Sequence, residues 1–176
     1  SETITISENE AAPTVTLSTS ASSINENSGS SLTLTATLST ATTADVTVSI
    51  GTGSTATEGA DYSTISDITI SAGATTGTAS FTPTDDNVYE GNETGIVAIS
   101  GVSGADAAES GSQSVTITIT ENESAPTVTL TSSASSITEN AGSSLTLTAT
   151  LSVATTADVT VGISTTGTLS LIHISE

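Results

Sequence analysis

The chain of 176 residues contains no lysine and no arginine, although it has 19 aspartate and glutamate residues and a formal net charge of −19. No carboxylate can therefore pair with a basic side chain, and each must face water, accept backbone hydrogen bonds or bind a cation. Nucleic acids and anionic membrane surfaces are bound mainly through lysine and arginine. We therefore expect neither of them among the partners of this protein.

Cysteine is also absent, so no disulfide stabilises the chain, and the aromatic residues are limited to Tyr62, Phe81 and Tyr89. No apolar run is long enough for a transmembrane helix, so we expect no direct membrane insertion. No signal-peptide pattern follows Ser1, which suggests an internal piece of a longer protein. Only 11% of the residues are charged, and small aliphatic and hydroxyl side chains dominate. This composition indicates a β-rich chain with a thin aliphatic core.

One long segment of the chain occurs twice. Residues 3–55 align without gaps on residues 116–168 at an offset of 113, and 42 of the 53 pairs are identical. A period of about 110 residues is the length of a small domain and is too long for a solenoid repeat. We therefore expect a tandem array: the end of a preceding repeat in residues 1–11, a complete repeat in 12–124, and the truncated start of a further repeat in 125–168.

The last eight residues, 169–176, depart from the repeat. They read LSLIHISE and contain the only histidine, His173. The octapeptide resembles translated sequencing-adapter read-through, and the alternative is a divergent or truncated native end. In either case we assign it no function.

Apolar and polar residues alternate along the complete repeat, as in SLTLTATL at 31–38, and this period of two is typical of half-buried strands. Clusters of Gly, Ser, Asn and Asp separate the strands. The fold class expected for seven such strands is all-β, a seven-stranded antiparallel immunoglobulin-like Greek-key sandwich, in tandem repeats. The strands are expected at 14–17, 31–38, 46–50, 65–70, 78–82, 95–100 and 115–120.

Most acidic residues fall in connections that this topology directs to one end of the sandwich. Consecutive antiparallel strands run up and down in turn, so alternate connections and the end of the last strand share a pole. The opposite pole receives only Asp45, Asp106 and Glu109. The nine carboxylates of the shared pole are Glu26, Glu58, Asp61, Asp85, Asp86, Glu90, Glu93, Glu121 and Glu123.

So many like charges repel one another, and a hard divalent cation is the physical remedy. Ca²⁺ takes about six to eight oxygen ligands in flexible geometry, whereas Mg²⁺ requires a tighter octahedron and retains water. Without cysteine or a usable histidine, softer metals such as Zn²⁺ are disfavoured. We therefore predict Ca²⁺ as the cofactor. The alternative is a solvated acidic pole that serves solubility.

Four short motifs make the complete repeat similar to a known family. INENSG precedes the strand at 31–38, STATEGADY resembles a GTA-x-x-G-x-DY signature, TDDNVYEGNET resembles a DD-x-x-x-E-x-x-E segment, and TITITENESAPTV resembles a closing strand with an acidic linker. Together, over residues 12–124, they resemble the Calx-beta domain. That domain is the calcium-binding immunoglobulin-like module of sodium/calcium exchangers, integrin β4 and large bacterial surface proteins.

The resemblance also implies a ligand set. The positions that match the family's motifs make Glu26, Asp61, Asp85, Asp86 and Glu90 the best calcium-ligand candidates. Glu121 and Glu123 are candidate closing ligands at the junction with the next domain.

Two departures from the family's pattern predict fewer ions or weaker binding. Glu121-Asn122-Glu123 replaces the usual run of aspartates, and Gly95-Ile96 replaces an aromatic residue. Glu93 is interpreted as structural, and Glu58 lies outside the signature.

The truncated repeat lacks the segments that carry Asp61 and Asp85, so Glu139 has no partners and is expected to bind no ion alone. Its strands also cannot close a sandwich. We therefore predict that residues 125–176 are poorly ordered in isolation.

The leading functional hypothesis is a calcium-binding structural repeat of a long extracellular or cell-surface, adhesin-like protein, in which Ca²⁺ stiffens the junction between domains. Pro126 in the short linker supports it. Expected partners are neighbouring repeats of the same chain, and beyond them surface ligands or other cells. The alternatives are a calcium-sensing module attached to a membrane protein, a calcium-independent solvated spacer, and an ice-binding surface suggested by the Thr-x-Thr runs.

An enzyme is the weakest hypothesis. The only histidine lies in the atypical tail, no G-x-S-x-G motif occurs, and no basic residue can bind an anionic substrate. Paired carboxylates could act as acid and base, but no aromatic-lined cleft is indicated. We therefore predict no catalytic activity.

Overall fold

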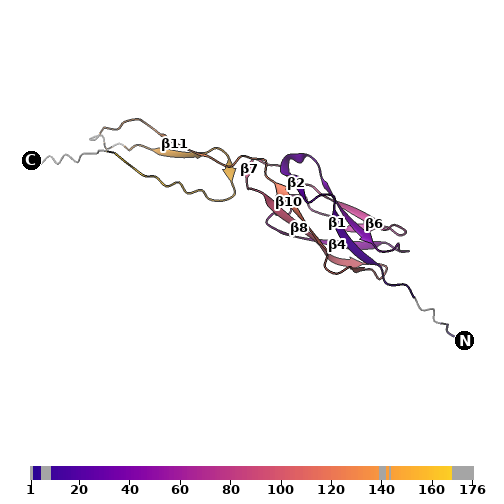
Figure 1. Cartoon of the computed structure of the whole chain (residues 1–176). Coiled ribbons are helices and arrows are strands. Elements are labelled where there is room, and N and C mark those ends of the chain that lie inside the picture. Colours follow the sequence, from indigo (N-terminus) through magenta and orange to yellow (C-terminus); the bar gives the residue numbers. More distant parts are fainter. Residues whose placement is uncertain (1, 5–8, 139–141, 143, 168–176) are drawn as a thin grey trace, which may run out of the picture.

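The computed structural model describes residues 2–4, 9–138, 142 and 144–167. A β-sandwich formed by the complete repeat is followed by a smaller β-part formed by the truncated repeat (Figure 1). Among the described residues, no helix is long and apolar enough to cross a membrane. The atypical tail at 169–176 lies outside the described residues.

Two sheets form the sandwich. The first has the order β6-β3-β1-β9 and consists of Thr76–Phe81, Leu32–Leu38, Thr14–Thr19 and Ala108–Glu109. The second has the order β2-β10-β8-β4-β5 and consists of Ser23–Asn25, Ser114–Thr120, Glu93–Ser103, Val46–Ser54 and Ile68–Ile70. The seven predicted strands are β1, β3, β4, β5, β6, β8 and β10, and the predicted all-β immunoglobulin-like sandwich is confirmed.

Within the two sheets of the sandwich, two short strand pairs are parallel, which differs from the purely antiparallel prediction. After β1 the chain crosses to the other sheet, where β2 runs beside β10 in the same direction. The short strand β9 also pairs in parallel with β1, through Thr14↔Ala108 and Val15↔Glu109. Strands of two or three residues carry no alternation that a sequence pattern could detect.

The strand predicted at 65–70 is shorter than expected, because carboxylate side chains accept the backbone N–H groups near its first residues. Asp67 accepts the N–H of Ile50 and the hydroxyl of Ser49, both at 3.0 Å, where β4 has a register shift between Ser49 and Ile50. Ile65 donates its N–H to Glu58 at 3.0 Å. Pairing with β4 therefore begins only at Ile68.

The core lies between the two sheets and follows the predicted alternation, so that Leu34 and Ala36 of β3 are fully buried while Thr35 between them is not. Its largest members, Tyr62 and Phe81, stack with ring centroids 4.7 Å apart. A Cβ at Gly95 would lie 3.2 Å from the Phe81 ring. A side chain at Gly95 would therefore crowd the stacked rings.

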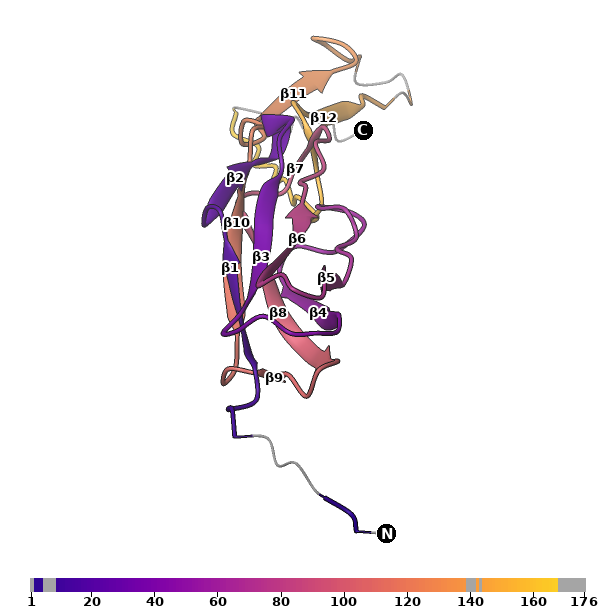
Figure 2. The same cartoon turned by 90° about the vertical axis from the view of Figure 1, so that its right-hand side faces the viewer.

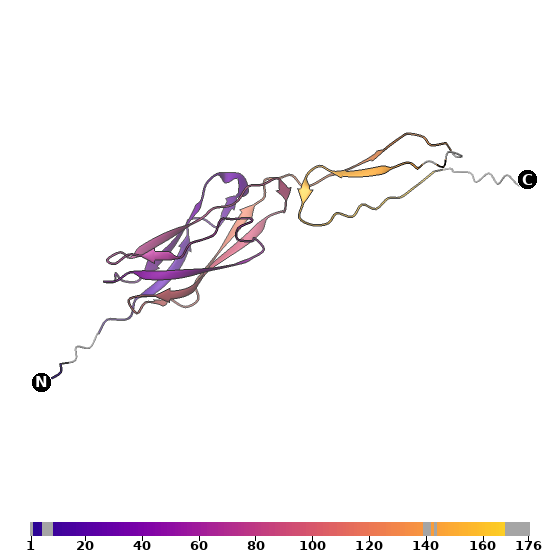
Figure 3. The same ribbon diagram turned by 180° about the vertical axis from the view of Figure 1, so that it is seen from behind.

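The truncated repeat forms a two-stranded hairpin of β11 (Val128–Ser132) and β12 (Leu147–Leu151), whose side chains are mostly exposed. It extends away from the sandwich (Figure 3). A further short strand, β13 (Ala154–Thr155), pairs in parallel with β7 (Val88–Tyr89) of the complete repeat. The strand β9 lies at the pole of the sandwich that is remote from β7 (Figure 2). Within its described residues, the truncated repeat contributes strands to the β11–β12 and β13–β7 pairs alone.

Candidate metal centre

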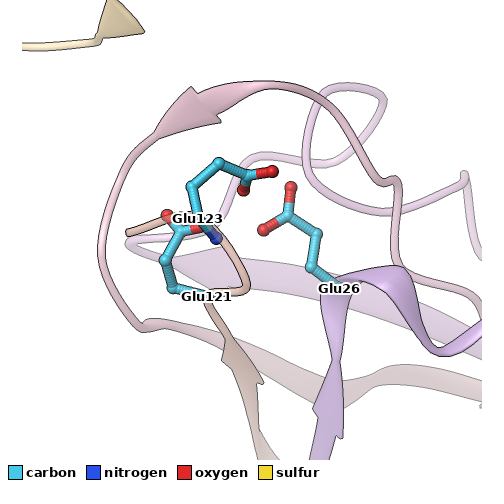
Figure 4. Close-up of side chains that lie close together, drawn as sticks. All are labelled: Glu26, Glu121 and Glu123. Atoms are coloured by element: carbon cyan, nitrogen blue, oxygen red, sulfur yellow. The ribbon is translucent and has the colours of Figure 1, made fainter. Parts of the chain in front are cut away.

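Three glutamates from two distant segments meet at the pole that leads to the truncated repeat. One carboxylate oxygen from each of Glu26, Glu121 and Glu123 lies within 4.8 Å of the others (Figure 4). Glu26 opens the 3₁₀ helix η1 (Glu26–Ser28) directly after β2, and the other two follow β10. Because β2 and β10 are parallel and pair through Asn25↔Thr120, the residues that follow both strands emerge at the same edge of the sheet.

Asp61, Glu90 and Glu93 form a second group at the same spacing. Asp61 lies between β4 and β5, Glu90 follows β7, and Glu93 begins β8. The Asp61 carboxylate accepts the N–H of Thr57 at 2.6 Å, and its backbone carbonyl accepts the N–H of Thr84 at 2.9 Å. The first bond closes the loop that carries Asp61, and the second joins that loop to the segment that leads into β7.

Glu121 joins the two groups. One of its carboxylate oxygens, Oε2, accepts the N–H groups of Glu90 and Gly91 at 2.6 and 2.8 Å. The other, Oε1, accepts those of Asn122 and Glu123 at 2.9 and 3.0 Å. Burial alone raises the pKa of Glu121, but the backbone donors of Glu123 and Glu90, the contact with the Glu123 side chain and the Gly91 backbone donor outweigh it and lower the pKa to about 2. Since four donors fill the lone-pair sites of this carboxylate, Glu121 positions the two segments and supplies negative charge.

The Glu123 carboxylate accepts fewer hydrogen bonds than the Glu121 carboxylate. Its Oε1 accepts a hydrogen bond from the Asn122 side chain at 3.0 Å, whereas its buried Oε2 has no hydrogen-bond partner within the part of the chain that the structure describes. Its contact with the Glu121 carboxylate, together with burial, raises its pKa. A buried carboxylate oxygen without a donor is costly unless a cation lies beside it.

Glu26 is only 8% exposed and accepts the N–H of Asp86 at 3.3 Å. Burial raises its pKa to about 7 despite that hydrogen bond, and the negative charges of Glu121 and Glu123 contribute further. In the second group, burial followed by repulsion from Asp61 raises the pKa of Glu93 to about 7. Burial raises the pKa of Glu90 as well. Both groups therefore hold more negative charge than the protein itself compensates.

The structure brings together five of the seven predicted ligands. Asp85 and Asp86 are exposed and lie outside both groups, although the Asp86 backbone contacts Glu26. The Asp86 carboxylate accepts the N–H of Val88 at 2.7 Å and so shapes the turn before β7.

Glu93, interpreted from the sequence as structural, places its carboxylate in the second group. The E-x-x-E spacing of Glu90 and Glu93 was the signal that could have identified it. Glu58, which lies outside the family signature, accepts hydrogen bonds from Ile65 and from the Thr52 hydroxyl at 2.7 Å and belongs to neither group.

The donor set suits a hard divalent cation. Both groups offer oxygen ligands alone, they come from several loops, and the chain has no basic side chain to compete with an ion. Ca²⁺ accepts six to eight such oxygens at roughly 2.3–2.6 Å. With Glu123 Oε2 lacking a donor, the first group fits a cation on chemical grounds.

Comparisons with known proteins bear on the family and the fold of the chain. A search of curated proteins found no match. The solved apo form of the Calx CBD1 domain is 15% identical, with a TM-score of 0.51, and the match covers 62% of this chain and 99% of that one, which shows the fold. The CBD12 structure from CALX1.2 is 17% identical with a TM-score of 0.49, and the match covers 56% of this chain and 41% of that one. The profile of the Calx-beta domain family matches residues 8–123, and the chain therefore belongs to the Calx-beta domain family.

Proposed function

We propose that the complete repeat binds Ca²⁺ through its two carboxylate groups and that the bound ion stiffens the junction with the next repeat of a long extracellular or cell-surface, adhesin-like protein. The observation that carries this proposal is the group formed by Glu26, Glu121 and Glu123. It joins the body of the sandwich to the segment that leads directly into the next repeat.

The position of this group explains how an ion would act on the junction. Glu123 is three residues before Pro126, and only a short linker separates it from β11. An ion held between Glu26 and Glu123 would fix the start of that linker to the sandwich, and Pro126 restricts the backbone that follows. Neighbouring repeats of the same chain are the partners that this arrangement implies, with surface ligands or other cells beyond them.

Charge compensation supplies the driving force. Glu26, Glu90 and Glu93 have raised pKa values because their charges are buried and near one another. A divalent ion bound between the carboxylates would offset both the cost of burying these charges and their mutual repulsion. Binding stabilises the folded state by RT ln(1 + [L]/Kd), or about 2.7 kcal/mol at a hundredfold excess over Kd. The millimolar calcium of extracellular fluids suits weak sites of this kind. The proposal assigns the repeat a binding role and no catalysis.

The test is thermal unfolding of the full chain in excess EDTA, in millimolar calcium and in millimolar magnesium. We expect a rise in Tm that is specific to calcium and is lost in Glu26→Gln. Asp61→Asn tests the second group in the same way. Equal melting of the wild type in all three solutions would overturn the proposal and leave a calcium-independent spacer.

The repeat provides a matched control. Glu139 occupies the position of Glu26 in the truncated repeat, which lacks the segments carrying Asp61 and Glu90. Glu139→Gln should leave the calcium response unchanged. X-ray scattering adds a second readout: a large change in the shape of the sandwich on calcium addition would favour a sensor, whereas a narrower distribution of end-to-end distances supports a stiffened junction.

A further inference from the structure

Strands β7 and β13 form a short pair across the repeat junction. Val88 pairs with Ala154 and Tyr89 with Thr155, in parallel. The two strands lie side by side in both Figure 1 and Figure 3. Glu90, a member of the second carboxylate group, follows Tyr89 directly, so this contact adjoins the acidic pole.

The partner of β7 belongs to a segment that the chain contains twice. At the offset of 113, Ala154–Thr155 corresponds to Ala41–Thr42, and the eight residues ATTADVTV are identical at 41–48 and 154–161. The complete repeat therefore carries a second copy of the strand that β7 pairs with. That copy lies at the pole opposite to β7, the pole that would face a preceding repeat.

Both copies of this segment adopt the same local structure. The Thr42 hydroxyl donates to the carbonyl of Ala44 at 2.8 Å, and the Thr155 hydroxyl donates to that of Ala157 at the same distance. The serine hydroxyls just before them also agree: Ser39 accepts the N–H of Thr14 at 3.0 Å and Ser152 that of Thr127 at 2.9 Å. These hydrogen bonds recur in both copies, and in the complete repeat the Thr42 carbonyl also accepts the N–H of Gly73 at 2.8 Å.

In the complete repeat this segment borders a hollow of about 480 Å³. The linker residues 10–13 and the loop residues Ala105 and Asp106 also line it. Ala41 is exposed beside it. Most of the lining side chains are small, so an extended backbone can approach closely, as in strand addition.

We propose that this hollow, at the N-terminal pole of each repeat, receives the Val-Tyr strand of the preceding repeat, which pairs in parallel with Ala41–Thr42 as β7 pairs with β13. Each repeat would then carry a strand at one pole and its acceptor at the other, a head-to-tail contact that propagates along an array. The inference rests on the tandem array of the proposed function, but it does not depend on calcium.

Cysteine cross-linking tests the pairing, because the chain has no native cysteine. In the full chain, Val88→Cys with Ala154→Cys should form a disulfide under mild oxidation. Val88→Cys with Ser133→Cys, an exposed site beyond the end of β11, should not. All three substitutions replace side chains outside the buried core, so the variants are expected to fold.

The hollow is tested in a chain that has a second copy of residues 12–124 inserted after Ser124. Val88→Cys in the first copy and Ala41→Cys in the second should cross-link at a rate within about threefold of the Val88–Ala154 pair. A cross-link to Ala154 but none to Ala41 would overturn the proposal, since the pairing would then belong to the truncated repeat alone. Absence of both cross-links would overturn it as well.

Calcium binding is judged separately, from the thermal shift. Cross-linking that succeeds in a protein without a calcium-specific rise in Tm would leave the docking intact and overturn the calcium part of the proposed function. A calcium-specific rise in Tm without cross-linking would support calcium binding and overturn the proposed docking.

Discussion

The segment SLTLTATL occurs at residues 31–38 and again at 144–151, and the two copies lie in different surroundings. Leu34 in β3 is fully buried, whereas Leu147 at the equivalent position in β12 is 48% exposed. The pairing with the preceding strand is nevertheless the same, since Val15↔Leu38 in the complete repeat becomes Val128↔Leu151 in the truncated one. The same local hairpin therefore forms with and without a core.

The strand that follows this hairpin forms in the complete repeat but not in the truncated one. In the complete repeat, β4 pairs with β5 on one side and β8 on the other, and Val46 and Val48 are fully buried. In the truncated repeat the equivalent residues Val159 and Val161 are 45% and 39% exposed and lie in no strand. Hairpin register is a local property, whereas a central strand requires partners from distant parts of the chain.

Completing the truncated repeat should have the largest effect on this comparison. A chain in which residues 56–124 follow Thr168, in place of 169–176, supplies the missing strands. We expect the second copy to gain the stability of an ordinary domain, about 5–15 kcal/mol, and the amides of β12 to gain strong protection from hydrogen exchange. Exchange at Leu147 that stays fast would show that the two copies differ for some reason other than missing strands.

Truncating the same leucine in each copy should separate the two surroundings. Leu34→Ala removes a fully buried side chain and is expected to lower the free energy of unfolding by about 2–5 kcal/mol. Leu147→Ala should change it by no more than about 0.5 kcal/mol, because the side chain is half exposed. Urea unfolding of the full chain, followed by circular dichroism, measures both. Equal losses would mean that the hairpin has a buried face in solution.

The acidic pole distinguishes the complete repeat from the hairpin, and pH should reveal it. Without calcium, the pKa values of Glu26 and Glu93 are raised to about 7 from 4.5, so between these values the folded state binds more protons than the unfolded state. Stability should therefore rise as the pH falls from above 7 towards 4.5. Glu121, with its pKa lowered to about 2, has the opposite effect, and its contribution is lost below 4.5.

The measurement for this prediction is the urea midpoint in EDTA as a function of pH. We expect a maximum between neutral and strongly acidic pH. Glu26→Gln should weaken the rise on its neutral side, whereas Glu139→Gln should leave the curve unchanged. A urea midpoint that falls steadily as the pH is lowered from neutral would contradict the burial of charge at this pole.

Substituting the two linker prolines should give the smallest difference in stability between the two repeats. Pro13 precedes β1, and its carbonyl accepts the N–H of Ala108 at 3.0 Å, whereas Pro126 precedes the exposed hairpin. Pro13→Ala is expected to lower the free energy of unfolding of the sandwich by about 0.4–1 kcal/mol, through the greater freedom of the unfolded chain. Pro126→Ala should leave the global unfolding unchanged and increase only the freedom of the junction, which X-ray scattering would detect.

The alternation of apolar and polar residues was sufficient to predict the seven main strands and the sandwich, because burial on one face imposes that period. It did not indicate β2, β7 or β9, which have two or three residues each and owe their pairing to neighbours distant in sequence. The parallel pairing of β2 with β10 matters most among these, since it brings Glu26 to Glu121.

The candidate site was predicted as a pole and only partly as a set of residues. The topology directed Glu26, Asp61 and Glu90 to one end, and the structure brings all three into the carboxylate groups. Neighbouring residues differ more subtly. Asp86 accepts a backbone N–H and lies outside both groups, whereas Glu93 belongs to the second group. Such choices depend on the geometry of individual turns, which the spacing of acids along the chain does not reveal.

The sequence by itself determined the strand pattern, the hairpin register and the absence of any basic side chain to balance the acids, because these depend on composition and on residues close together in the chain. The tertiary structure decided which copy of the repeated segment is buried, which carboxylates meet, and which of their oxygens lack a donor. Those outcomes depend on the docking of strands that lie far apart in sequence, and the truncated repeat has only some of those strands.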